Sequence, residues 1–144
     1  YGILMHMDEV VVGFGRTGRL FGFQNYDGVM PDIVTCAKGI SGASLPLSMT
    51  ACSEEIMDFF EDKPLGYGST YQAHPVAMAA AYENVKYILQ EDIVARVQSM
   101  APLFAEGMQR IANRHPCIKQ YRAIGFFPPL PSYSLRSATY YQRG

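Results

Sequence analysis

Two short, mainly apolar runs, each ending in a charged residue, constrain the fold of this 144-residue chain most strongly. Residues 3–7 lead into Asp8, and residues 33–37 lead into Lys38. Runs of this length and character are typical of strands buried on both faces of a parallel sheet. Open α/β folds bind ligands at the carboxyl ends of such strands. The sequence therefore predicts that Asp8 and Lys38 lie at a ligand-binding edge of a sheet.

A third strand and a short helix are predicted next along the chain. Residues 45–52 form the third apolar run, and Ser53 is a favourable N-cap for a helix over residues 54–62. Two acidic residues occupy the first turn of that helix, where the helix dipole favours negative charge. We expect this segment to continue the α/β pattern of the first two strands.

Two longer helices are predicted in the second half of the chain. Pro75 suits the first position of a helix that runs to about residue 90, with apolar residues on one face. A further amphipathic pattern covers residues 92–114. Pro102 lies inside it and is expected to kink or split the helix, because proline removes a backbone donor.

The composition excludes several classes of function. Apolar residues make up 49% of the chain and charged residues 17%, as in an ordinary globular domain. The net charge is -1 and no Lys/Arg-rich run is present, so we expect neither nucleic acid nor an anionic membrane as a partner. No apolar stretch approaches the roughly 18 to 20 residues that span a bilayer.

The cysteines and the start of the chain indicate the cellular setting. Cys36, Cys52 and Cys117 are odd in number and lack metal-ligand spacing, which favours reduced thiols over disulfides or a metal site. With no leader sequence visible, we expect a cytoplasmic protein, although an organelle stays possible. The chain begins at Tyr1 beside a core strand, so we expect its N-terminus to be cut.

A glycine motif, Gly13-Phe-Gly-Arg-Thr-Gly18, follows the first predicted strand and matches the spacing of dinucleotide-binding loops. The match is weak, because a helix has to begin at the last glycine for its N-terminus to meet a pyrophosphate. Residues 20–28 carry glycines and turn residues instead. Asp8 and Glu9 would also place negative charge beside a dianion. The sequence therefore disfavours a dinucleotide site.

Asp8 and Lys38 indicate a function only when they are considered as a pair. An ionised carboxylate at the end of an apolar strand costs several kcal/mol unless a cation or hydrogen-bond donors compensate it. A partly desolvated lysine amine is a nucleophile suited to carbonyl chemistry. Each alone is more often a solvated surface charge. Together they match a cofactor that has an aldehyde for the amine and a pyridinium nitrogen for the carboxylate.

The motifs in combination resemble class III aminotransferases, which depend on pyridoxal 5'-phosphate (PLP). In order, they are Asp8-Glu9-Val10, the glycine motif, Pro31-Asp32-Ile33, Ala37-Lys38-Gly39 and Gly68-Ser-Thr-Tyr71 with His74-Pro75. The resemblance covers residues 1–127, about the middle third of a full-length member. It implies an α/β fold: part of the large domain of a fold-type-I PLP-dependent transferase, with three α/β/α layers around a mostly parallel sheet.

The resemblance implies a role for individual residues. Lys38 would form the Schiff base with PLP, Asp8 would pair with the protonated pyridine nitrogen, and Val10 would pack on the face of the ring. Thr70 resembles the residue that reaches from the neighbouring subunit to the cofactor phosphate. Val11 stands where many members have a glutamine that bonds the phenolic oxygen, and valine cannot donate that bond. For Glu9 and Arg16 we expect support of the loop or of a subunit contact.

The implied reaction is a ping-pong amino transfer by a homodimer, from an amino donor, expected to be an ω-amino acid, to an oxo acid such as pyruvate. Two alternatives stay open. The same lysine and aspartate serve class III aminomutases and decarboxylases. The second alternative is that the chain is a catalytically incomplete fragment whose proline-rich segment, residues 128–131, binds a partner in the manner of P-x-x-P ligands.

Residues 128–144 form a Pro-, Tyr- and Ser-rich tail that does not match the family, so residues 1–127 are predicted as the partial PLP-binding domain. Residues 122–127 resemble the start of the family's next strand, but Pro128 and Pro129 cannot continue a central strand. We expect the carboxy-terminal domain, the phosphate-binding glycine loop and the aromatic residue that covers the ring to lie outside the chain. The isolated chain is therefore expected to be inactive.

Overall fold

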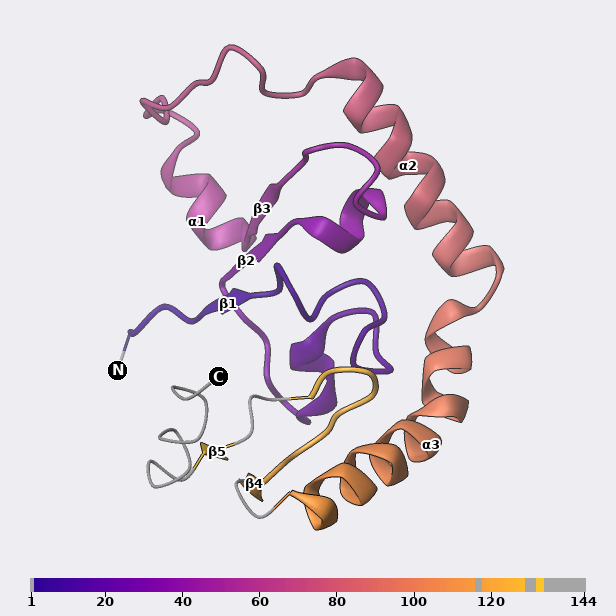
Figure 1. Ribbon diagram of the computed structural model, residues 1–144. Helices are drawn as coiled ribbons and strands as arrows, with labels where there is room; N and C mark the ends of the chain where they lie inside the picture. The colour runs from indigo at the N-terminus through magenta and orange to yellow at the C-terminus, as the bar shows by residue number, and fades with distance from the viewer. Residues whose placement is uncertain (1, 116–117, 129–131, 134–144) are drawn as a thin grey trace, which may run out of the picture.

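The computed structural model describes residues 2–115, 118–128 and 132–133. Its elements follow one another as shown in Figure 1. The strands are β1 (His6–Asp8), β2 (Ile33–Cys36), β3 (Met49–Cys52), β4 (Ile118–Gln120) and β5 (Ser132–Tyr133). The helices are α1 (Glu54–Phe59), α2 (Pro75–Gln90) and α3 (Ile93–Arg114), with 3-10 turns η1 (Gly22–Asn25) and η2 (Lys38–Ser41).

The first three strands form one mixed sheet in the order β1-β2-β3. β1 and β2 are parallel, as predicted, and Asp8 lies opposite Thr35. β3 runs antiparallel to β2, so only one of the two pairings in this sheet is parallel. The physical reason is the connection between β2 and β3, residues 37–48, which contains η2 but no crossover helix that would return the chain to the same end of the sheet.

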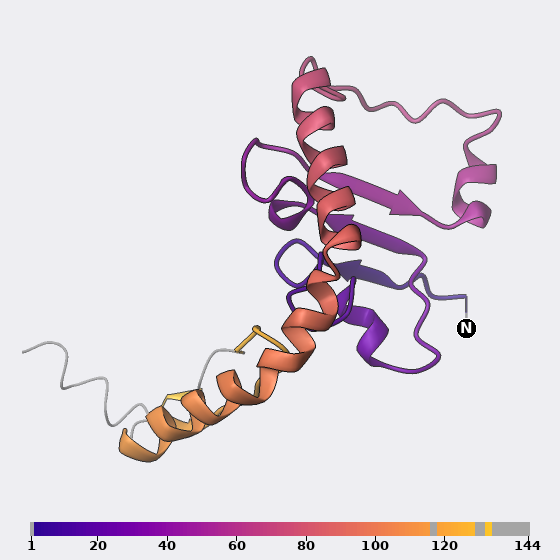
Figure 2. The ribbon, with the colours of Figure 1, turned by 90° about the vertical axis from the view of Figure 1, so that its right-hand side faces the viewer.

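The long helices cover one face of this sheet. In Figure 2, α2 crosses in front of the three strands, and α3 continues beyond β1. α2 packs on η2 and on α3. The buried apolar residues lie on these elements and at the end of β2: Cys36, Ile40, Ala77, Ala81, Ile88 and Val97. Among the described residues the sheet therefore has one helical layer, where three layers in all were expected.

The predicted strands are shorter and less buried than expected. Residues 3–5 lie outside β1, and Ile3 is 83% exposed. Residues 45–48 form a loop that leads into β3, and Ala37 follows the end of β2. The prediction that the strands are buried on both faces was wrong within this chain, because only one face of the sheet meets a helix.

The helices agree better with the sequence. α2 has the predicted bounds, with Pro75 at its start. α1 ends at Phe59, three residues earlier than predicted, where the Phe60 N–H closes the turn on the Met57 and Asp58 carbonyls. α3 is one continuous helix, so Pro102 does not split it. The carbonyl that loses its backbone partner belongs to Gln98, and both Gln98 and Pro102 are exposed residues of the helix.

The segment after α3 differs from the prediction. Residues 124–127 turn back on themselves through an Ile124–Phe127 bridge instead of starting a strand. Gly125 has a φ of +58°, and a Cβ there would lie 2.5 Å from the Thr17 carbonyl carbon. The Phe126 N–H donates to the Arg16 carbonyl at 2.8 Å. This turn therefore docks on the glycine motif, and its close approach requires glycine.

Part of the predicted tail has regular structure. Ser132–Tyr133 form β5, which pairs antiparallel with β4, although no strand was expected on either side. Tyr1, Cys117 and residues 129–131 and 134–144 lie outside the described residues. The expectations for Cys117 and the P-x-x-P segment fall there. No helix in the described part of the chain is long and apolar enough to cross a membrane.

Asn84 of α2 fixes η2 to the helix layer, and its removal tests this packing. Its Nδ2 donates to the Gly39 carbonyl at 2.8 Å and to the Ile40 carbonyl at 3.0 Å. Asn84→Ala leaves both carbonyls without this donor, so the free energy of unfolding should fall by about 1–2 kcal/mol in chemical denaturation. Asn113→Ala, on the exposed end of α3, is the control and should change it by less than about 0.5 kcal/mol. Equal effects would contradict the assigned role of Asn84.

Candidate functional site

Lys38 lies where the chain leaves β2, and its backbone is strained. It begins η2 with a φ of +45°, in the left-handed region that residues other than glycine rarely adopt. Such a conformation costs on the order of 1–3 kcal/mol, and it is concentrated at functional sites. The Ala43 N–H donates to the Lys38 carbonyl at 3.0 Å, and Asn84 binds the next two carbonyls. The surrounding contacts therefore hold Lys38 in a conformation that it would not adopt alone.

Two cavities meet at Lys38. The larger, of about 990 Å³, extends from Ala37 and Lys38 to the connection between α1 and α2 and is lined there by Tyr67, Ser69 and Tyr71. The smaller, of about 460 Å³, lies between Lys38, the glycine motif and the first turns of α3. Both volumes suit a small organic ligand. The exposed amine of Lys38 is thus placed at the boundary of two candidate binding sites.

Asp8 ends β1 at the same edge of the sheet at which β2 leads into Lys38. The parallel register pairs Asp8 with Thr35, three residues before Lys38. Its Oδ1 accepts a hydrogen bond from the Val10 N–H at 2.9 Å. Within the described residues no salt bridge joins Asp8 to Lys38. The structure therefore confirms that the two charged residues follow neighbouring parallel strand ends.

Other predicted cofactor residues are less directly placed. Val10 is half-buried in the turn after Asp8, and Thr70 is exposed in the connection between α1 and α2. Ser69 and Tyr71 line the larger cavity, but Thr70 is not among its lining residues. Asp8 and Val10 line neither cavity. The cofactor roles of Asp8, Val10 and Thr70 therefore stay predictions.

Glu9 is a buried acid directly after β1, with only 2% of its surface exposed. Its Oε2 accepts a hydrogen bond from the Gly22 N–H at 2.7 Å, and its Oε1 accepts one from the Phe23 N–H at 2.9 Å. The expected support of the loop is thereby confirmed. The sequence carries no signal for the partners, because they lie thirteen and fourteen residues further along the chain.

The same contacts bear on the dinucleotide alternative. No helix begins at Gly18, and the next helical turn, η1, starts at Gly22. The first N–H groups of η1 already bind the carboxylate of Glu9. A pyrophosphate would therefore meet an occupied turn and a negative charge, so the structure also disfavours dinucleotide binding.

The cysteines near the site are free thiols. Cys36, two residues before Lys38, is fully buried, and Cys52 is half-buried on β3. Burial raises the pKa of the Cys36 thiol, and the negative charges of Glu9 and Asp8 raise it further. This thiol therefore stays protonated and packs as an apolar side chain. The described ranges contain no group of three His, Cys, Asp or Glu side chains that could hold a metal ion.

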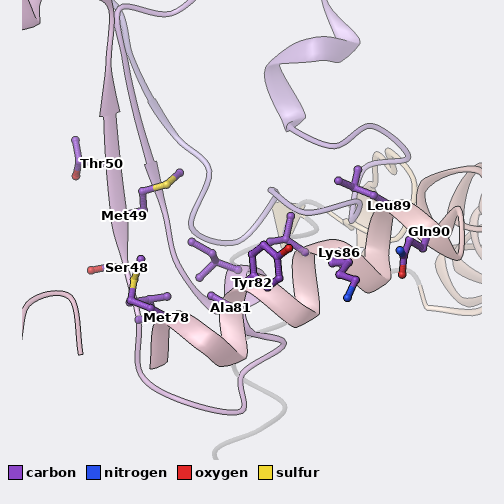
Figure 3. Close-up of a pocket in the computed structure, with 12 residues that line it drawn as sticks. Ser48, Met49, Thr50, Met78, Ala81, Tyr82, Lys86, Leu89 and Gln90 are labelled. Carbon is purple, nitrogen blue, oxygen red and sulfur yellow. The ribbon is translucent and has the colours of Figure 1, made fainter. Parts of the chain in front are cut away.

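A third cavity, of about 710 Å³, lies away from Lys38. Figure 3 shows it between α2 and the chain that enters β3, with Met78, Ala81 and Tyr82 on the helix side and Met49 on the strand side. Its walls are mostly apolar, and it contains none of the predicted site residues. Among the described residues no acidic residue and no histidine lines it, so it is a poor candidate for an active site.

Comparison with known proteins identifies the family of the chain. The family model of class III aminotransferases matches residues 1–130. The chain is 38% identical over 130 residues to gamma aminobutyrate transaminase 1, mitochondrial, of Solanum lycopersicum. This match covers 87% of this chain and 25% of that protein. It is 37% identical over 132 residues to putrescine–pyruvate aminotransferase of Pseudomonas aeruginosa, covering 90% of this chain and 28% of that protein.

The fold agrees with a solved relative. The crystal structure of taurine:2-oxoglutarate aminotransferase from Bifidobacterium kashiwanohense, in complex with PLP and glutamate, matches with a TM-score of 0.84 and 41% identity. The match covers 89% of this chain and 28% of that one. The chain thus spans about a quarter of the length of these relatives. On the family match and on these similarities, the chain belongs to the class III aminotransferases.

Proposed function

We propose that the protein is a PLP-dependent aminotransferase in which Lys38 binds the cofactor covalently. The observation that carries this proposal is the strained Lys38 at a strand end, at the boundary of two cavities, with Asp8 ending the neighbouring parallel strand. Family membership makes a PLP site the best match for this amine and carboxylate. The relatives are more than three times as long as this chain, so the activity of the whole protein is part of the proposal.

The residues present fit PLP in their chemistry. The Lys38 amine suits the aldehyde of the cofactor, and the Asp8 carboxylate suits its pyridine nitrogen. Val10 would pack on the ring, and Thr70 would donate to the phosphate of the neighbouring subunit's cofactor. When bound, PLP withdraws electron density from the reacting carbon of the amino substrate.

Each residue then has a defined task in the reaction. The Lys38 amine would act as general base, taking the proton from the reacting carbon of the amino donor, and then as general acid, delivering it to the carbon two bonds away. The Asp8 carboxylate keeps the pyridine nitrogen protonated, since a nearby negative charge favours the charged form. Half-buried apolar side chains in the larger cavity, among them Leu45 and Leu47, would limit the access of water to the reacting groups.

The proposed substrates are an ω-amino acid or related amine as donor and an oxo acid such as pyruvate as acceptor. The relatives are named for gamma-aminobutyrate, putrescine with pyruvate, and taurine with 2-oxoglutarate, which supports an amino group at the end of the donor. The names of these relatives favour amino transfer over the aminomutase and decarboxylase alternatives.

A homodimer in the cytoplasm completes the proposal. Residues 61–76 are exposed throughout, and part of this connection lines the cavity at Lys38. Leu65, Tyr67 and Tyr71 are large apolar side chains in it, which favours coverage by a second subunit. Several relatives carry the word mitochondrial or chloroplastic in their names, so the compartment stays a prediction.

The first test of the proposed function is removal of the amine. In the full-length protein that contains this chain, Lys38→Ala should abolish covalent PLP and amino transfer, because no other lysine in the described part of the chain lies at this strand end. The measurement is borohydride reduction followed by peptide mapping of the pyridoxyl label, together with transfer from an ω-amino acid to pyruvate.

Lys86→Ala is the matched control for this test. Lys86 forms an exposed salt bridge with Glu83 at 3.3 Å, and Lys63 lies over the Phe59 ring at 4.0 Å. Both lysines therefore have partners away from the proposed site. The control should keep the label and the activity. A label found on Lys63 or Lys86 in the unchanged protein would show that the site assignment is wrong.

The second test removes the charge of Asp8 while keeping its shape. Asp8→Asn should leave PLP bound but lower the rate of proton removal from the amino donor by about 100-fold or more, because the ring nitrogen loses its anionic partner. Single-turnover kinetics with the loaded enzyme measure this step. Asp58→Asn on α1 removes an exposed acid away from the site and should have no effect. A near-normal single-turnover rate in Asp8→Asn would reject the pairing.

A further inference from the structure

We infer that Glu9 is a positioning residue for amino transfer. Its buried carboxylate holds in place the glycine-rich loop, residues 10–22, which lines the smaller cavity beside Lys38. This inference deepens the proposed function and rests on it. Glu9 does not line either cavity at Lys38, so it would act through the loop and not on the substrate.

The contacts of Glu9 leave its carboxylate little freedom. Both oxygens accept backbone N–H groups, from Gly22 at 2.7 Å and from Phe23 at 2.9 Å. Hydrogen bonds to an ionised acceptor are stronger than neutral ones, and a buried carboxylate without them would be costly. Within the described part of the chain no lysine or arginine forms a salt bridge with Glu9. Its burial therefore depends on the position of η1.

The backbone of Glu9 joins the same loop to the sheet. Its N–H donates to the Thr35 carbonyl at 2.8 Å, which continues the β1–β2 ladder one residue beyond Asp8. Its carbonyl accepts a hydrogen bond from the Gly13 N–H at 3.0 Å. One residue thus contacts β2, the start of the loop and, through its side chain, the far end of the loop at Gly22.

The loop in turn contacts the segment that carries Lys38. Val11, Gly13 and Arg16 line the smaller cavity together with Lys38. Phe14 packs so closely on the next residue that a Cβ at Gly39 would lie 3.0 Å from the Phe14 Cβ. A shift of the loop therefore changes the space at Lys38 and presses on its neighbour. An error near 1 Å at reacting groups can cost about a hundredfold in rate.

Two substitutions disturb the contact between the Glu9 carboxylate and the backbone of residues 22 and 23 by different means. Glu9→Gln keeps the length of the side chain but turns an NH2 group toward one of the two N–H donors, so one hydrogen bond is lost. Gly22→Ala keeps the charge but places a Cβ 2.9 Å from Val12 Cγ2 and 3.2 Å from both Glu9 oxygens, which displaces the carboxylate. If the position of the loop determines the rate of amino transfer, both variants should have the same loss of kcat.

Matched controls are available elsewhere in the chain. Glu83→Gln removes an exposed acid on α2. Gly107→Ala adds a Cβ that meets nothing within 4 Å on α3. Both controls should behave as the unchanged protein in every measurement.

The test compares these variants in the full-length protein with an ω-amino donor and pyruvate. The quantities are kcat and KM per PLP-loaded subunit, and amide hydrogen exchange at Gly22 and Phe23 without cofactor. We expect Glu9→Gln and Gly22→Ala to lower kcat by about 10- to 100-fold, with KM for the donor changed by less than about threefold. Exchange at the two amides should become at least about tenfold faster.

Three outcomes would overturn the inference. The first is a normal kcat per loaded subunit in Glu9→Gln despite faster amide exchange. This result would show that Glu9 stabilises the fold but does not affect amino transfer. The second is a normal kcat in Gly22→Ala beside a low one in Glu9→Gln, which would assign the effect to charge. The third is unchanged exchange in both variants, which would contradict the contact itself. Failure of the proposed function is distinct, since it appears in the unchanged protein as the absence of a pyridoxyl label on Lys38.

Discussion

The parallel pairing of β1 with β2 is the interaction on which the site depends. It places the Asp8 and Lys38 segments at one edge of the sheet, although the two residues are thirty positions apart in the sequence. The bond from the Glu9 N–H to the Thr35 carbonyl extends this pairing beyond Asp8, to the point where the loop begins. A slip of the register by one residue would turn Asp8 to the opposite face of the sheet. Backbone hydrogen bonds thus fix the relative positions of the two segments.

Features that depend on local sequence could be predicted well. The bounds of α2 follow from Pro75, the apolar spacing of the fifteen residues after it and the turn after Gln90. Lys38 and Asp8 were placed correctly at strand ends because each follows an apolar run. These signals need only a few neighbouring residues, and the physical preferences behind them act over the same short range.

Features that depend on distant partners could not be predicted. The hydrogen bonds from Gly22 and Phe23 to Glu9, and the docking of Gly125 on Thr17, join residues that carry no mutual signal in one sequence. The left-handed backbone of Lys38 depends on Ala43 and Asn84, which lie outside the lysine motif. The antiparallel direction of β3 likewise follows from the path of the connecting segment and not from the residues of the strand.

The backbone of Lys38 has a consequence for how such a protein changes over generations. A glycine in the same left-handed conformation would relieve on the order of 1 kcal/mol of strain, so chains that have lost the amine can fold more stably than chains that keep it. Selection for stability alone would therefore remove the lysine. Under the proposed function, the lysine at this position serves the chemistry of its amine at the expense of stability.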